Sequence, residues 1–139
     1  DELFRRARAG WASRADLAAR LEKLYRVGAV GAPVWRGERS FALRRDPDQD
    51  HAVLVVTEPS GAERTLVDPA AVDPSGLTTL DAWAPSKEGD LLAYAMSDGG
   101  TEWAAIRVLD VATGAVVDGP VTRTRHPSIA WLPGGRQCP

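Results

Sequence analysis

The chain has 139 residues, of which 44% are hydrophobic and 26% charged, as is typical of one soluble globular domain. Its seventeen basic and nineteen acidic residues give a net charge of −2, which offers no electrostatic reason to expect nucleic acid or an anionic membrane as a partner. The single cysteine, Cys138, excludes an internal disulfide, and the absence of a membrane-spanning run or a signal-peptide pattern leads us to expect a cytoplasmic protein.

The first 26 residues predict a helical segment that ends near Gly28. Ser13 lies three residues before Asp16, in a weaker relative of the capping box. After it, apolar side chains recur on one face at helical spacing: Leu17, Leu21, Leu24 and Tyr25. An earlier helical stretch is suggested by Leu3, Phe4 and Trp11. The arginines of this segment are interpreted as a solvated helical face or tail rather than a binding patch: Arg5, Arg6, Arg8 and Arg14.

From Pro33 onward, short runs rich in Val, Leu, Ala and aromatic residues alternate with turn residues, and we expect no helix after residue 27. A shift of 53 positions aligns Phe41-Ala42-Leu43 with Tyr94-Ala95-Met96. A third copy begins where Ala130-Trp131-Leu132-Pro133 resembles Ala82-Trp83-Ala84-Pro85. Repeats of roughly 40–50 residues, with about four strands each, are typical of β-propeller blades.

The sequence therefore predicts a mainly β protein. A partial, truncated β-propeller over residues 31–139, of about two four-stranded blades plus the start of a third, follows an α-helical segment over residues 1–30. The first blade is expected to contain the strands Ser40–Arg45, Ala52–Thr57 and Arg64–Val67. The second is expected to contain Leu77–Ala84, Leu91–Ser97, Ala104–Asp110 and Ala115–Val121.

Four finer expectations follow from the repeat. The turns Pro33–Gly37 and Pro85–Gly89 should superimpose. Trp83 and Trp131 should occupy equivalent positions in successive blades. Ile106 and Val108 should be buried between sheets. Arg107, next to them, needs a partner or an exit to solvent.

The residues that could carry chemistry give no catalytic, cofactor-binding or metal site, and we expect no cofactor. No Gly-x-Ser-x-Gly string surrounds any of the seven serines, which are Ser13, Ser40, Ser60, Ser75, Ser86, Ser97 and Ser128. Two histidines, His51 and His126, are too few for a zinc site without carboxylates. The acids at 46, 48 and 50 resemble a calcium loop that lacks its glycine and closing glutamate, so we interpret them as a solvated hairpin tip. The tryptophans are expected to pack between blades, with Trp103 the best candidate for an exception.

Several strings, in order and spacing from about residue 20 to 136, carry a resemblance to a known family. They are "GAPVWRGERSF" (Gly31–Phe41), "LVDPAAV" (Leu66–Val72), "PSKEGDLLAYAMSDGGTEW" (Pro85–Trp103), "IRVLDVATG" (Ile106–Gly114) and "IAWLPGG" (Ile129–Gly135). The chain resembles the amino-terminal part of the prolyl oligopeptidases, serine peptidases that cut short peptides after proline. It departs from the family pattern at Glu88 and Glu102, where the family has aspartate, and after Gly135.

The resemblance implies a propeller that restricts access to a Ser–His–Asp triad on a carboxyl-terminal α/β-hydrolase domain. That domain is absent from this chain, which we expect to be inactive alone and to be a fragment or a truncated product; whether the natural protein continues past Pro139 stays open. Its partners would be the hydrolase domain or remaining blades and, through the whole enzyme, short proline-containing peptides. Two alternatives stay open: a propeller-like protein-interaction module without catalytic activity, and self-association through open strand edges.

Overall fold

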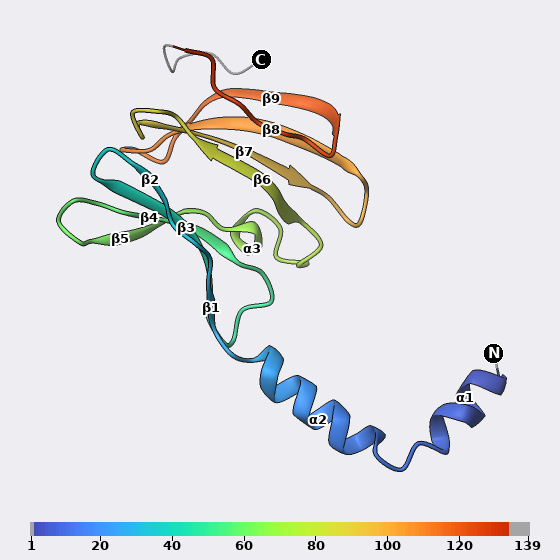
Figure 1. Cartoon of the computed structure of the whole chain (residues 1–139). Helices are drawn as coiled ribbons and strands as arrows, with labels where there is room; N and C mark the ends of the chain where they lie inside the picture. The colour runs from blue at the N-terminus through green and yellow to red at the C-terminus, as the bar shows by residue number, and fades with distance from the viewer. Residues whose placement is uncertain (1, 134–139) are drawn as a thin grey trace.

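The computed structural model describes residues 2–133 as a helical arm followed by two antiparallel β-sheets (Figure 1). The arm contains α1 (Glu2–Ala9) and α2 (Arg14–Tyr25), so residues 10–13 interrupt the predicted helical segment. Gly10 favours this break because glycine loses more conformational freedom in a helix than any other residue. Ser13 occupies the N-cap position of α2, as the sequence predicts, but its side chain makes no capping hydrogen bond.

The arm is tied to the sheets mainly through Arg45. Its Nη2 donates to the carbonyl oxygens of Tyr25 (2.8 Å) and Val27 (3.0 Å), and its guanidinium lies 4.8 Å from the centre of the Tyr25 ring. Every residue of both helices is exposed, including the leucines of the predicted apolar face, which are 52–62% exposed. The apolar face of α2 therefore has no partner among the described residues.

The first sheet, which we call blade one, contains five strands: β1 (Ala29–Val30), β2 (Val34–Arg36), β3 (Arg39–Arg45), β4 (Val53–Thr57) and β5 (Glu63–Val67). The β2, β3, β4 and β5 strands form an antiparallel meander, and β1 pairs with the last residues of β3. Proline at position 33 separates β1 from β2, because it has no N–H to donate to the ladder.

The second sheet, blade two, is a four-stranded meander of β6 (Thr79–Pro85), β7 (Leu91–Ser97), β8 (Trp103–Asp110) and β9 (Val116–Arg125). The seven strands predicted from the sequence all begin within two residues of their predicted positions. The two meanders confirm the mainly β fold and its partial propeller character. The expectation of no helix after residue 27 is wrong for one short helix, α3 (Pro69–Val72), which Asp68 caps by accepting a hydrogen bond from the Ala70 N–H.

The repeat is real, but its period in the structure is 52 residues rather than 53. The pair Phe41–Val56 in blade one corresponds to Ala93–Val108 in blade two, 52 residues later at both positions. Because successive strand residues point to opposite faces, the difference of one residue exchanges the two faces of the sheet. Tyr94 therefore does not occupy the position of Phe41.

The blades pack face to face through a shared core. Blade one contributes Phe41, Leu54, Val56 and Val67, and blade two contributes Leu92, Tyr94, Met96, Leu109 and Val111. Full burial of such side chains stabilises a fold by about 1.5–3 kcal/mol each. The shared core is therefore the main source of cohesion between the blades, and Trp83 of β6 packs against it.

The opposite face of blade two carries Ile106 and Val108. Val108 is buried but Ile106 is only half-buried, and among residues 2–133 no sheet lies on this face, so the predicted burial between sheets is wrong. The chain after β9 returns beside β6, where the indole Nε1 of Trp131 donates to the Ala84 carbonyl oxygen at 3.0 Å. Trp83 packs against the shared core and Trp131 against β6, but 48 residues separate them (131 − 83) rather than 52, so their equivalence stays a prediction. Residues 127–133 form no strand, and the remainder of the predicted third blade lies outside the described residues.

The other face of blade one, which we call its rear face, carries a small apolar cluster of Ala42, Val53 and Val55. Arg44 of β3 forms an ion pair with Glu63 of β5. Since β4 lies between those strands, and both residues share the face of Val53 and Val55, this ion pair crosses the cluster. The cluster is buried although no second sheet in the described part of the chain covers it.

The predicted match between two turns is wrong. Residues 34–36 form strand β2, which connects to β3 through the two-residue turn at Gly37 and Glu38. The corresponding loop between β6 and β7 has five residues, Ser86 to Asp90. The buried Ser86 hydroxyl donates to Asp90 Oδ1 at 2.7 Å and accepts from the Leu91 N–H at 3.1 Å, which holds this longer loop in shape.

Candidate functional site

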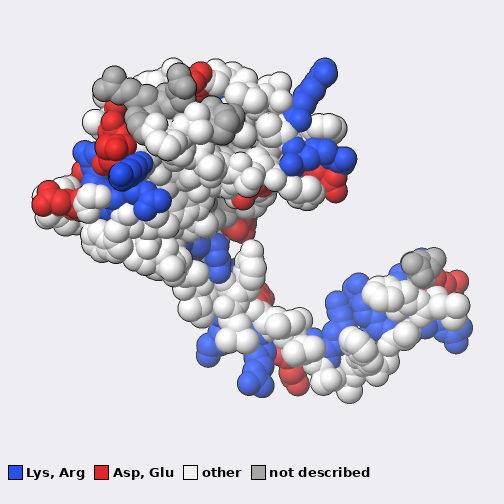
Figure 2. Space-filling model, turned by 45° about the horizontal axis from the view of Figure 1, so that its top comes forward, with Lys and Arg blue, Asp and Glu red and all other residues white. Residues whose placement is uncertain are grey.

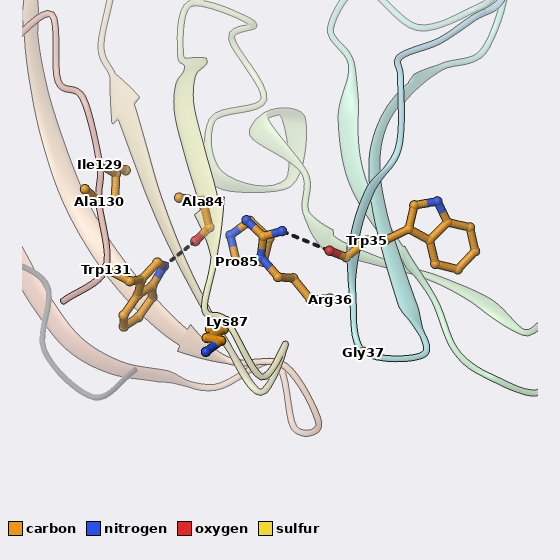
Figure 3. A pocket seen from close by; sticks show the side chains of 9 residues that line it. All are labelled: Trp35, Arg36, Gly37, Ala84, Pro85, Lys87, Ile129, Ala130 and Trp131. Carbon is orange, nitrogen blue, oxygen red and sulfur yellow. Dashed lines mark hydrogen bonds between the residues drawn. The ribbon is translucent and has the colours of Figure 1, made fainter. Parts of the chain in front are cut away.

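A cleft lies where β2 of blade one, β6 of blade two and the returning chain meet (Figure 3). It encloses about 450 Å³, within the range of roughly 300–1,000 Å³ of small-ligand pockets. Its lining residues are Trp35, Arg36, Gly37, Ala84, Pro85, Lys87, Ile129, Ala130 and Trp131. Three segments distant in sequence build the cleft, so it exists only while the blades are docked.

One wall of the cleft is apolar and fixed. The hydrogen bond from Trp131 to the Ala84 carbonyl oxygen orients the indole beside β6, which ends at the buried Pro85. Figure 3 shows Trp35 turned away from the cleft, so that this residue lines it with its backbone. The indole of Trp131 is therefore the aromatic surface that a ligand would meet.

The other wall is cationic. Figure 3 shows the guanidinium of Arg36 pointing toward Pro85, and its Nη1 donates to the Trp35 carbonyl oxygen at 2.9 Å. Lys87 comes from the β6–β7 loop and is exposed. Within the described residues, neither cation forms an ion pair, whereas Arg39 and Arg64 on the same sheets do. The cleft thus carries two positive charges without carboxylate partners.

A charged cluster of Arg39, Glu58 and Arg64 connects the two blades close to this cleft. Glu58 Oε2 accepts from Arg39 Nε at 2.7 Å, and its Oε1 accepts from Arg64 Nη2 at 3.0 Å. Arg39 Nη1 also donates to the Gly89 carbonyl oxygen at 3.1 Å, and Arg64 donates to the Val111 carbonyl oxygen, both in blade two. The hydrogen bond from Arg39 is the largest cause that lowers the pKa of Glu58 from its ordinary value.

The connection between the blades is held by Asp73. Its carboxylate accepts hydrogen bonds from the backbone N–H groups of Ser75, Leu77 and Thr78 and from the Thr78 hydroxyl. The bonds from Ser75 are the largest cause that lowers the pKa of Asp73 to about 2. The turn that leads into β6 is therefore fixed by an ionised carboxylate.

Neither histidine lines this cleft, and the buried Ser86 beside it is bonded to Asp90 and Leu91 of its own loop. His51 Nε2 lies 2.8 Å from the Gly76 carbonyl oxygen, so it tethers a loop. A second hollow brings His126 near Ser97 and Asp81. The Ser97 hydroxyl hydrogen-bonds to Thr79 Oγ1 at 3.2 Å, and no hydrogen bond joins it to His126 in the described part of the chain. This arrangement lacks the nucleophile–base contact that a triad requires.

Other expectations from the sequence can now be placed. The acids at 46, 48 and 50 lie in the exposed loop between β3 and β4, as a hairpin tip should. Across residues 2–133, no group of three or more metal-ligating side chains is assembled.

Trp103 is half-exposed under the guanidinium of Arg125 (4.9 Å), so it is an exception to packing between blades. Arg107 is half-buried and lines an opening beside Trp103, which gives it an exit to solvent.

Sequence reasoning missed the cleft and the Arg39–Glu58–Arg64 cluster. The cleft depends on how blade one sits on blade two, and the cluster depends on the pairing of β3, β4 and β5. No spacing within one strand reveals either relation. The sequence also gives no signal that Arg36 lacks a carboxylate partner in the described structure, because Glu38 is only two residues away. In addition, none of the helices between residues 2 and 133 is long and apolar enough to cross a membrane.

Comparisons with known proteins agree on one family. The sequence profile described as "Prolyl oligopeptidase, N-terminal beta-propeller domain" matches residues 3–137. The prolyl endopeptidases of Elizabethkingia miricola and Elizabethkingia meningoseptica are each 28% identical over 119 residues, which is 86% of this chain and 17% of each relative. This chain therefore spans about a sixth of the length of these relatives.

Solved structures show the same fold. A chain from a structural and mechanistic study of two prolyl endopeptidases matches with a TM-score of 0.72 and 32% identity, over 81% of this chain and 17% of that one. Prolyl oligopeptidase B from Galerina marginata, solved with a 35mer hydrolysis and macrocyclization substrate, matches with a TM-score of 0.78 and 19% identity. That match covers 96% of this chain and 21% of the other, and at this identity it supports the fold alone.

Proposed function

This chain belongs to the prolyl oligopeptidase family, in whose amino-terminal β-propeller domain it lies, and on that premise we propose that it helps to control which peptides reach a catalytic site. The site would be a Ser–His–Asp triad on an α/β-hydrolase domain that cleaves short peptides after proline. The observation that carries the proposal is the profile match over nearly the whole chain, joined to two blades that dock through one core.

The first strands of the blades suit this role. In a propeller the blades surround a central channel. The strands β2 and β6 begin the two meanders and lie on opposite sides of the cleft. A peptide that moves along the channel would pass these strands. The shared core and the ion cluster would keep that passage narrow, so that folded or long chains are rejected.

The helical arm suits a second contact, with the hydrolase domain. Its leucines are exposed, and residues 1–27 carry seven basic and four acidic residues. Figure 2 shows Lys and Arg side chains gathered along the arm. An apolar and partly acidic surface on the hydrolase domain would cover α2 and match its charge. We further propose a cytoplasmic location for the whole protein.

The experiment is a chimera. The matching segment of the Elizabethkingia miricola prolyl endopeptidase is replaced by residues 1–139 of this chain, and hydrolysis of a chromogenic Gly-Pro peptide is compared with hydrolysis of casein. We expect the chimera to cleave the short peptide and to leave casein intact. Cleavage of both substrates would show that this chain does not restrict access. The unmodified relative is the control.

Self-association is a second proposal, favoured by the outer strand of blade two. No residue of β9 is buried, and Val116, Val117 and Val121 are 53–60% exposed. One side of β9 pairs with β8, and no strand among the described residues pairs with its other side. An exposed edge with apolar side chains is a template for pairing with another chain.

A further inference from the structure

The cleft between the blades carries an inference about what it binds. It combines two cations that have no carboxylate partner among residues 2–133 and one fixed indole beside a proline. Cations in a cleft attract an anion, and a guanidinium matches a carboxylate in geometry because it offers parallel N–H donors. One N–H of the Arg36 guanidinium donates to the Trp35 carbonyl oxygen, and this bond holds the guanidinium in place. Its other N–H donors remain for a ligand.

The apolar wall narrows the choice of anion. Ala84, Pro85 and the Trp131 indole offer no charge to a ligand, so the best occupant has one carboxylate next to an apolar group. The flat faces of Trp131 and Pro85 suit a compact ring. A terminal proline has that form, since its carboxylate is attached directly to the pyrrolidine ring.

We propose that this cleft binds the free carboxylate end of a short peptide whose last residue is proline. This inference rests on the proposed function, because hydrolysis after proline adds water across the bond and leaves such a carboxylate on the amino-side product. The carboxylate accepts hydrogen bonds from Arg36 and Lys87, and the ring lies against Trp131. The cleft is then a product site in the propeller.

The test measures binding to the 139-residue chain itself, without any hydrolysis. The probe is N-acetyl-Ala-Pro with a free carboxylate, compared with the same compound as its carboxyl-terminal amide. Binding is followed in ¹⁵N-labelled protein through the indole N–H resonance of Trp131, which W131F assigns. We expect the acid to bind about tenfold or more tightly than the amide, since one or two charge-assisted hydrogen bonds are lost in the amide.

Matched variants separate the cleft from general charge. R36Q/K87Q should weaken binding of the acid to the level of the amide. The control R20Q/K23Q removes the same charge from exposed positions of α2 and should bind like the unsubstituted chain. N-acetyl-Ala-Gly should bind several-fold more weakly than N-acetyl-Ala-Pro, because it lacks the ring.

Three results would overturn the inference: no binding of the acid, equal binding of acid and amide, or equal loss in the two double variants. The comparison of acid with amide uses the unsubstituted chain, so it tests the inference even if R36Q/K87Q fails to fold.

The outcome of this binding experiment is separate from the outcome of the chimera experiment. A chimera that gates substrates while the acid fails to bind refutes only the product site, and binding without gating refutes the proposed function.

Discussion

Replacement of Glu58 by glutamine should loosen the contact between the blades. Glu58 holds Arg39 and Arg64, and both arginines donate to backbone carbonyl oxygens of blade two. Glutamine keeps the shape of the side chain and one acceptor oxygen but removes the negative charge. The two guanidinium groups would then repel each other without a carboxylate between them.

The size of the effect follows from the contacts. A hydrogen bond to a charged group contributes about 1.5–3 kcal/mol when buried, and far less when exposed. The side chains of Glu58, Arg39 and Arg64 are 22%, 29% and 35% exposed, so solvent screens them in part. Two bonds are weakened and one acceptor is kept, so we expect Glu58→Gln to lower the free energy of unfolding by about 1–2 kcal/mol.

The effect should depend on pH in one direction. Because the folded protein lowers the pKa of Glu58, the unfolded chain binds this proton more readily. The stabilisation from Glu58 is present above the ordinary glutamate value of 4.5 and is lost as the pH falls through the lowered value. The difference in the free energy of unfolding between the unsubstituted chain and Glu58→Gln should therefore be constant near neutral pH and should shrink in acid.

Urea unfolding followed by circular dichroism, at pH 7 and again in acid, measures this difference. Glu22→Gln is the matched control, because its ion pair with Arg26 lies within one helix turn and both side chains are more than 60% exposed. That control should change stability by less than about 0.5 kcal/mol. The reasoning fails if the two variants lose the same stability at pH 7, or if the Glu58 effect persists undiminished in acid.

Three further predictions concern the backbone, the chemistry and the edges. Gly89→Ala should destabilise the chain by about 1–3 kcal/mol in the same urea assay, because Gly89 has a φ of +76° and an added Cβ would lie 3.1 Å from the Arg36 carbonyl oxygen. Gly99→Ala, with a φ of +57° but open space around it, should cost less. The purified chain should not hydrolyse a chromogenic proline peptide, since it has no nucleophile elbow, and turnover that survives removal of contaminating peptidases would contradict this. Light scattering should show association that grows with concentration and is reduced by Val117→Lys on β9; a monomer at all concentrations would refute pairing through that edge.

The strands could be predicted because their signals are local. Apolar runs bounded by glycine, proline and aspartate place the start of each of the seven predicted strands within two residues, although β1 and β2 were not predicted and β9 runs on to Arg125. The period was misjudged by one residue because similarity of side chains favours the match of Phe41 with Tyr94, although the hydrogen-bonded ladder pairs Phe41 with Val56 and Ala93 with Val108. Similarity of residue type thus identified the repeat, whereas the strand pairing determined which residues lie on each face of the sheet.

The candidate site could not be predicted for a different reason. Arg36 and Trp131 are almost a hundred residues apart and meet only through the docking of blades. The contacts of Glu58 with Arg39 and Arg64 likewise require the meander to be formed, since these residues come from the starts and ends of three strands. α3 was missed because it has four residues, too few to show helical periodicity.

The ion pair between Arg44 and Glu63 has a consequence for the order of assembly during synthesis. It covers the apolar cluster on the rear face of blade one with charge, whereas the far face of blade two leaves Ile106 half-buried. In a propeller the blades surround a central channel, so each blade packs between two others. Because the ion pair already covers Val53 and Val55, blade one can stay soluble once its own strands have paired, before a neighbouring sheet packs on its rear face.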